Sequence, residues 1–285
     1  MNYTTLISAS ELASHLNDSN WAIFDCRHDL LQPTAGSDAF AAGHIQNAQF
    51  ANMDTELSGA KAPAGAAFTG RHPLPERHTL ITTLRGWGIN DDTQVVAYDG
   101  QGGMYAARLW WLLRWIGHAN VAVLDGGLAA WQAQGLPVVT PVAPRPAGNI
   151  TEQASLARTV SVQEVVANLA PQELQVLDAR APDRFRGENE TIDPVGGHIP
   201  GAKSRFFKDN LQPDGRFKPA RELEQEFAGL IDKPEAAIMQ CGSGVTACHN
   251  LLALEVAGLP GAALYPGSWS EWCADPARPV ATGNT

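Results

Sequence analysis

The chain has 285 residues, which corresponds to about two domains at roughly 150 residues each. Its 44% apolar and 18% charged residues are typical of a globular protein. Its formal net charge of −10 disfavours binding to nucleic acid or to an acidic membrane surface. Its most apolar run is interrupted by Arg114 and is shorter than the roughly 18 residues that cross a bilayer. Four cysteines are too few for a disulfide scaffold, and no signal peptide is visible, so we expect a reduced, soluble, cytoplasmic protein.

The sequence contains one pattern twice. The first copy reads AIFDCR, GHI, VVAYDGQGG and DGGLAAW, and the second reads QVLDAR, GHIPGA, AIMQCGSG and GSWSEW. Four landmarks recur in the same order at nearly constant spacing, pairing Asp25 with Asp178, His44 with His198, Asp99 with Cys241, and Trp131 with Trp272. The repeat predicts two domains, 1–147 and 148–285. Between them lies the proline-rich segment 136–153, which suits an extended connection because proline fixes φ and lacks an N–H.

Within each copy, short apolar runs alternate with helical patterns along the chain. In the first copy, the runs predict strands at 21–24, 94–98 and 119–124 and a helix at 104–116. In the second copy, they predict strands at 175–177, 237–240 and 262–265 and a helix at 245–257. This alternation indicates an α/β fold in which each domain has a parallel sheet with helices on both faces. We expect the binding site beyond the carboxyl ends of the strands.

The most informative segment is the loop that follows the strand ending at Gln240. It reads CGSGVT and leads directly into a helix. Glycines allow such a loop to curl so that several backbone N–H groups point at one centre, and the helix N-terminus adds partial positive charge. Both effects favour a thiolate over a thiol, and the thiolate is the nucleophile. We therefore predict that Cys241 is a nucleophile, and that the same loop would hold a persulfide or an anionic leaving group.

Two other cysteine chemistries fit the loop less well. Cysteine-dependent phosphatases use the pattern Cys-x5-Arg, but Ala247 stands at the arginine position here. A redox dithiol is disfavoured because Cys241 and Cys248 do not form C-x-x-C. The first copy has Asp99 at the cysteine position, and a carboxylate cannot carry sulfur, so the two copies cannot be equivalent sites.

Taken together, these motifs resemble the tandem rhodanese-like sulfurtransferases over essentially the whole chain. The resemblance rests on D-x-R after a strand in both copies, GHI in both copies, DGG…W and GSWSEW, and the six-residue loop that opens with Cys241. It implies a catalytic second domain and an inactive first one, which agrees with the contrast between Cys241 and Asp99. It also implies that Gly242, Gly244, Val245 and Thr246 hold the substrate through the loop.

The resemblance also assigns roles to side chains outside the loop. It implies that Arg184, in DRFRG, binds the substrate carboxylate. A second arginine is usual before GHIPG, but this chain has Asp193 and no arginine in that stretch, so either Arg186 replaces it or nothing does.

A proton relay is also typical of the family. The resemblance implies that Asp54, in ANMDTELSG, and His72, in GRHPLP, act with Ser243 as catalytic residues.

The neutral loop favours one sulfur donor. CGSGVTA is similar to the loop of 3-mercaptopyruvate sulfurtransferases, whereas thiosulfate sulfurtransferases carry basic residues after the cysteine. A neutral loop suits a monoanionic keto acid better than a dianion. We expect transfer of sulfur from 3-mercaptopyruvate through a Cys241 persulfide to cyanide or to a thiol acceptor such as thioredoxin. A thiosulfate:cyanide sulfurtransferase and a non-enzymatic persulfide carrier or sensor are the alternatives. No His/Cys spacing matches a metal site, so we expect neither metal nor cofactor.

Overall fold

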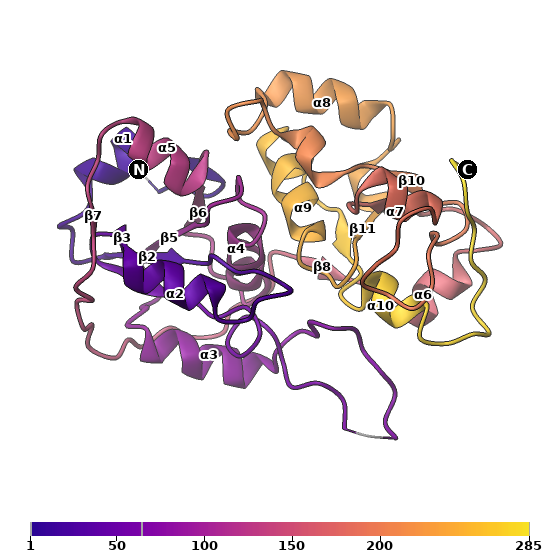
Figure 1. The fold of residues 1–285 in the computed structure, drawn as a ribbon, viewed down its shortest axis with the longest axis horizontal. Coiled ribbons are helices and arrows are strands. Elements are labelled where there is room, and N and C mark those ends of the chain that lie inside the picture. Colours follow the sequence, from indigo (N-terminus) through magenta and orange to yellow (C-terminus); the bar gives the residue numbers. More distant parts are fainter. Residues whose placement is uncertain (1, 64, 285) are drawn as a thin grey trace. The chain divides into compact units, whose positions relative to one another are not determined.

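The computed structural model describes residues 2–63 and 65–284, which form two compact units (Figure 1). The units are not simple halves of the chain. The first unit comprises Met1–Gly59, Pro75–Leu156 and Leu211–Phe217, and the second comprises Ala60–Leu74, Ala157–Asn210 and Lys218–Thr285. The segment around His72 therefore belongs to the second unit, although it precedes most of the first unit's helices in the sequence. The predicted boundary near residue 147 lies in the stretch between β7 (Val138–Val139) and β8 (Arg158–Thr159), which has no helix or strand.

The described part of the first unit is built on a five-stranded sheet in which every neighbouring pair is parallel. Its order is β1-β6-β5-β2-β4, with bounds β1 Leu6–Ile7, β2 Trp21–Asp25, β4 Ala48–Phe50, β5 Gln94–Tyr98 and β6 Val121–Leu124. A separate antiparallel pair joins β3 (His44–Ile45) to β7. The helices are α1 Ala9–Ser14, α2 Ala35–Ala42, α3 Arg77–Gly86, α4 Ala106–Trp115 and α5 Gly127–Ala133. Figure 1 shows α1 and α5 together on one side of the sheet and α3 on the other.

The described part of the second unit is built on a sheet of the same kind. Its order is β10-β9-β11-β12-β8, again with parallel neighbours, and the further bounds are β9 Gln175–Asp178, β10 Lys203–Ser204, β11 Ala237–Gln240 and β12 Ala263–Leu264. The helices are α6 Val162–Ala167, α7 Pro182–Arg186, α8 Ala220–Ala228, α9 Ala247–Val256 and α10 Ser268–Trp272, with 3₁₀ turns η1 Phe207–Asn210 and η2 Pro234–Ala236. Helices α8 and α9 pack together, as Figure 1 shows, and α9 packs on β11.

The two sheets have the same strand order when the strands are matched in sequence. Strands β8, β9, β10, β11 and β12 take the places of β1, β2, β4, β5 and β6. The shared strand order, in two parallel sheets with helices around them, confirms the predicted α/β class. The central strands lie close to their predicted bounds, whereas the two-residue edge strands had no apolar run long enough to predict them.

The D-x-R motif ties a strand to the following turn in the same way in both units. Arg27 forms an ion pair with Asp25 and donates a hydrogen bond to the carbonyl of Gly43 (2.7 Å). Arg180 pairs with Asp178 and donates to the carbonyl of Gly197 (2.6 Å). Both bonds hold the GHI turn against the strand end.

The histidine of each GHI motif has a structural environment that is also repeated. His44 Nδ1 contacts the carbonyl oxygen of Phe40 at 2.9 Å and its ring stacks on that phenylalanine. His198 makes the same contact with the carbonyl oxygen of Phe185, also at 2.9 Å, and stacks on that ring. Both histidines are fully buried, which fits a packing role better than a chemical one.

Within residues 2–63 and 65–284, the helices are all too short or too polar to cross a lipid bilayer.

The Asp178–Arg180 pair supports a prediction about the stability of the second unit. Both side chains are almost completely buried, and breaking a buried ion pair leaves an uncompensated charge. We expect Asp178→Asn to lower the free energy of unfolding by about 3–5 kcal/mol, measured by urea denaturation. The control is Glu188→Gln, which removes an exposed carboxylate from the same unit. Equal unfolding free energies for the two variants would contradict this role for the pair.

Candidate active site

Cys241 directly follows the carboxyl end of β11 and is the first residue of the loop that leads to α9. The cysteine is 2% exposed. Its sulfur accepts the backbone N–H of Gly244 at 3.1 Å and that of Ser243 at 3.5 Å. The loop therefore curls around the sulfur so that two N–H donors point at it, and such donors stabilise negative charge on that atom.

The N-terminal turn of α10 holds the backbone of this loop in place. Ser268 Oγ accepts the N–H of Cys241 (3.1 Å), and the N–H of Trp269 donates to the carbonyl of Cys241 (2.9 Å). The N–H of Ser270 donates to the carbonyl of Gly242 (3.0 Å). The first two peptide groups of the loop are thus fixed from one side, which orients the remaining N–H groups toward the sulfur.

In the equivalent loop of the first unit, the backbone N–H groups bind the carboxylate of Asp99, a side chain of the loop itself. This buried carboxylate accepts four backbone N–H groups at 2.7–3.0 Å, from Gln101, Gly103, Tyr105 and Ala106. Counted from the strand end, Gln101 and Gly103 correspond to Ser243 and Val245. Counted from the helix, Tyr105 and Ala106 correspond to Thr246 and Ala247, because the loop of the second unit is one residue shorter. Loops at the same place in the two units therefore direct backbone N–H groups at a carboxylate in one copy and at a thiol in the other. We call the loop around Cys241 an anion cradle.

Ser243 and His72 meet in the second unit. Ser243 Oγ and His72 Nδ1 are 2.8 Å apart, and both residues are buried. Ser243 is also the residue whose backbone N–H donates to the Cys241 sulfur, so the serine that meets His72 belongs to the cysteine loop. A histidine bonded to a serine next to a nucleophile can carry a proton to or from that centre.

Two guanidinium groups lie over Gly242. A Cβ at that position would be 2.8 Å from Nη2 of Arg71 and 3.8 Å from Nη2 of Arg184. Asp193 lies between the two arginines, forming an ion pair with Nη1 of Arg71 and another with Nη2 of Arg184 (3.2 Å). Burial raises the pKa of Asp193 above its usual value, although the positive charge of Arg71 opposes the rise.

A second carboxylate completes this cluster of charges. Glu190 pairs with Arg184 at 2.9 Å and with Arg180 at 3.4 Å. Burial would raise the pKa of Glu190, but hydrogen bonds from Arg184 and from two backbone N–H groups outweigh it and lower the pKa. The guanidinium of Arg180 lies 4.6 Å from the ring centroid of Trp269, which is fully buried beneath it. The cluster is therefore fixed to the same α10 turn that holds the cysteine loop.

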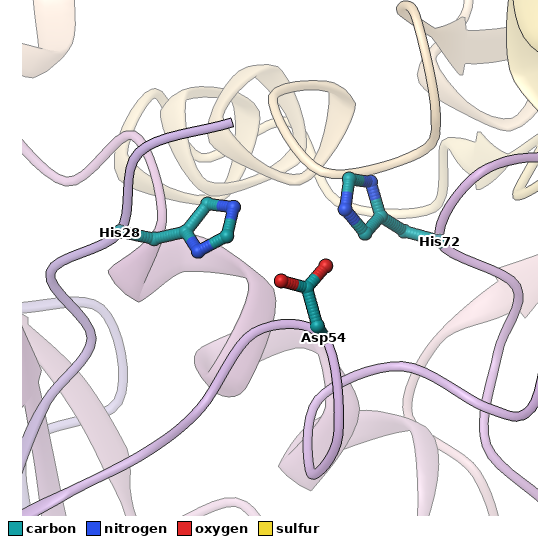
Figure 2. A group of neighbouring side chains, drawn as sticks. All are labelled: His28, Asp54 and His72. Atoms are coloured by element: carbon teal, nitrogen blue, oxygen red, sulfur yellow. The ribbon is translucent and has the colours of Figure 1, made fainter. Parts of the chain in front are cut away.

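Asp54 belongs to the first unit. Figure 2 shows its carboxylate directed toward the ring of His28, which is in the same unit. Burial lowers the pKa of His28, and the negative charge of Asp54 opposes this shift. His72, the other residue of the predicted relay, is also drawn in Figure 2 and belongs to the second unit. The relay role of Asp54 stays a prediction.

The remaining predicted residues occupy the loop or its surroundings. Gly244 has a left-handed φ of +75°, and a side chain there would collide with the carbonyl of Pro266. Val245 is buried, and Thr246 is the N-cap residue of α9. Arg186, the suggested replacement for the missing second arginine, forms an ion pair with exposed Glu188 at 2.7 Å.

Sequence reasoning missed three residues of this cluster. The sequence patterns assign no role in the site to Arg71, Glu190 or Asp193. Arg71 immediately precedes the predicted His72, and that neighbourhood was the one signal that could have pointed to it.

Comparison with known proteins places these features in context. The rhodanese-like domain family matches residues 8–134 and 161–275. A probable 3-mercaptopyruvate sulfurtransferase of Pseudomonas aeruginosa is 46% identical over 287 residues, covering all of both chains. A mouse thiosulfate sulfurtransferase is 41% identical over 207 residues, covering 70% of this chain and 69% of that protein. The solved structure of 3-mercaptopyruvate sulfurtransferase from Leishmania major superimposes with a TM-score of 0.83 at 32% identity, covering 95% of this chain and 74% of that one.

The contact at Gly244 yields a prediction with a matched control. Gly244 and Gly258 both have left-handed φ values near +75°, but only Gly244 faces an obstructing carbonyl, whereas a Cβ at Gly258 meets nothing within 4 Å. We expect Gly258→Ala to cost about 1 kcal/mol of unfolding free energy, from the backbone conformation alone. Gly244→Ala should cost clearly more, because the loop must also move away from Pro266. Equal losses in thermal denaturation would show that the loop is not tightly held.

Proposed function

The chain belongs to the rhodanese-like domain family, and from that membership we propose that it is a sulfurtransferase that takes sulfur from 3-mercaptopyruvate onto Cys241. The observation that carries this proposal is the cradle around the Cys241 sulfur, which receives the N–H groups of Ser243 and Gly244. The high identity to the Pseudomonas aeruginosa relative over the full length supports the choice of donor.

The first step is a displacement at sulfur. The Cys241 thiolate attacks the sulfur of 3-mercaptopyruvate, a new S–S bond forms, and the donor's C–S bond breaks with its electron pair moving to carbon. The fragment that leaves is the enolate of pyruvate, and the enzyme keeps the outer sulfur as a persulfide. Arg184 binds the donor carboxylate and so aligns the two sulfur atoms. The N–H donors of the loop stabilise the charge that the persulfide carries.

The leaving enolate must gain a proton to become pyruvate. The donor's own thiol proton balances this transfer once the persulfide ionises. Ser243 Oγ and His72 Nδ1 are 2.8 Å apart, and the backbone N–H of the same serine donates to the Cys241 sulfur, which supports them as the route for that proton. The family resemblance adds Asp54 behind this pair as a further member of the relay.

The second step returns the enzyme to its starting form. An acceptor thiolate, such as that of reduced thioredoxin, attacks the outer sulfur of the persulfide, and the S–S bond to Cys241 breaks. The acceptor leaves as a persulfide, or as thiocyanate when cyanide is the acceptor. Two separate displacements predict ping-pong kinetics. All four cysteines are free, which is consistent with a reducing compartment such as the cytoplasm, where acceptor thiols are available.

Thiosulfate is the second candidate donor. The mouse relative is a thiosulfate sulfurtransferase, and two guanidinium groups lie over the loop of this chain. The loop itself is neutral, since Gly242 and Ser243 follow the cysteine. We therefore rank thiosulfate below 3-mercaptopyruvate, with lower activity expected for it.

Replacement of the proposed nucleophile tests the main claim. Cys241→Ser should abolish pyruvate release from 3-mercaptopyruvate, because a serine hydroxyl cannot hold a persulfide. The matched control is Cys273→Ser. Burial raises the pKa of the Cys273 thiol to about 11, so it is protonated at neutral pH and should be dispensable. Many equivalents of pyruvate per wild-type chain distinguish an enzyme from a persulfide carrier, which would stop after one. Appreciable turnover by Cys241→Ser would contradict the proposal.

The proton route has its own test. Ser243→Ala removes the hydroxyl that meets His72, and we expect kcat for pyruvate release to fall about 100-fold or more, the usual size of a general acid–base contribution. Ser204→Ala, at an exposed position in β10, serves as the control. A kcat for Ser243→Ala equal to that of the control would exclude the serine from proton delivery.

A further inference from the structure

The space over Gly242 is bounded by guanidinium groups from two distant segments. Nη2 of Arg71 and Nη1 of Arg184 lie 2.8 Å and 3.9 Å from the position that a Cβ of Gly242 would take. Gly242 is next to Cys241, and any larger residue there would press against Arg71. Both guanidinium groups therefore lie beside the residue that follows the proposed nucleophile.

Both of these nitrogen atoms are open donors. Asp193 accepts from Nη1 of Arg71 and from Nη2 of Arg184, while Glu190 accepts from Nε and Nη2 of Arg184. Among the described residues, Nη2 of Arg71 and Nη1 of Arg184 have no acceptor, and the buried Nε of Arg71 has none either. Of the three guanidinium nitrogens within 4 Å of that position, Nη2 of Arg184 is already paired with Glu190 and Asp193, whereas Nη2 of Arg71 and Nη1 of Arg184 remain available to a ligand.

Asp193 demonstrates what these arginines can hold. Its single carboxylate spans Arg71 and Arg184, with one oxygen paired to each guanidinium. The two groups are therefore close enough together to be joined by one carboxylate, and guanidinium groups bind carboxylates through strong charge-assisted hydrogen bonds.

We propose that Arg71 is the second anchor for the donor carboxylate, and that Asp193 sets the charge which the two arginines present to the donor. This inference rests on the proposed function, since it concerns donor binding at Cys241. It assigns the anchoring role to the segment before His72 and not to Arg186, whose side chain pairs with exposed Glu188.

The balance of charges among the arginines and carboxylates near Gly242 favours a donor with a single negative charge. Three arginines, at positions 71, 180 and 184, are matched by three carboxylates, at positions 178, 190 and 193. The cluster has no net charge, so it offers hydrogen bonds to a carboxylate without the excess positive charge that would favour a dianion. Removing the carboxylate of Asp193 would leave a net charge of about +1 over Gly242 and favour thiosulfate.

Donor binding can be measured without turnover. In the Cys241→Ser background, titration calorimetry with 3-mercaptopyruvate should give an affinity that Arg71→Ala lowers about tenfold or more, the cost of losing charge-assisted hydrogen bonds. Arg186→Ala is the control and should leave the affinity unchanged. Equal affinities for Arg71→Ala and Arg186→Ala, or no binding by the parent, would overturn the anchoring role. These results do not depend on whether the wild-type protein transfers sulfur, which pyruvate turnover decides separately.

The role of Asp193 is tested with Cys241 present. Asp193→Asn keeps the shape of the side chain, and we expect it to raise the ratio of thiosulfate to 3-mercaptopyruvate kcat/KM at least tenfold, mainly through a lower KM for thiosulfate. Glu188→Gln removes an equal charge from an exposed site in the same unit and should leave the ratio unchanged. A ratio for Asp193→Asn equal to that of Glu188→Gln would overturn the charge-setting role.

Discussion

The convergence of backbone N–H groups on one atom at the end of a parallel strand is the interaction on which this site depends. The fold forms that turn twice. In the first unit it binds the carboxylate of Asp99 through four N–H groups, and in the second it surrounds the sulfur of Cys241. Because peptide dipoles are fixed by the fold, they cost little reorganisation when charge develops on the bound atom. The proposed difference between the two copies therefore lies in what the loop surrounds, a carboxylate in the first unit and a thiol in the second.

The residues around the Cys241 loop form two regions with different proposed roles. The α10 turn fixes the loop backbone from one side, and Ser243 with His72 is the proton route that we propose. The arginines over Gly242 form the other region, to which we assign the selection of the donor. Arg180 links the two regions, since its guanidinium pairs with the acidic cluster and lies over Trp269 of α10.

Periodicity and repetition predicted the parts of the fold that are locally encoded. The central strands at Gln94–Tyr98 and Ala237–Gln240 each consist of an apolar run with a glutamine at one end, and the repeated D-x-R and GHI motifs aligned the two copies. The two-residue edge strands were missed because pairing with a neighbour, and not their own sequence, makes them strands. The cluster around Asp193 was missed for a similar reason. Arg71 and Asp193 are far apart in the chain, and only the folding of segment 60–74 into the second unit brings them together.

The central claim is that sulfur is carried on Cys241 within its cradle. The most direct test is peptide mapping by mass spectrometry after the protein is mixed with one equivalent of 3-mercaptopyruvate and no acceptor. The account predicts an addition of about 32 Da, one sulfur atom, on the peptide that contains Cys241. It also predicts that this addition disappears when a thiol acceptor is supplied. A stable addition on Cys26, Cys248 or Cys273, with Cys241 unmodified, would contradict it.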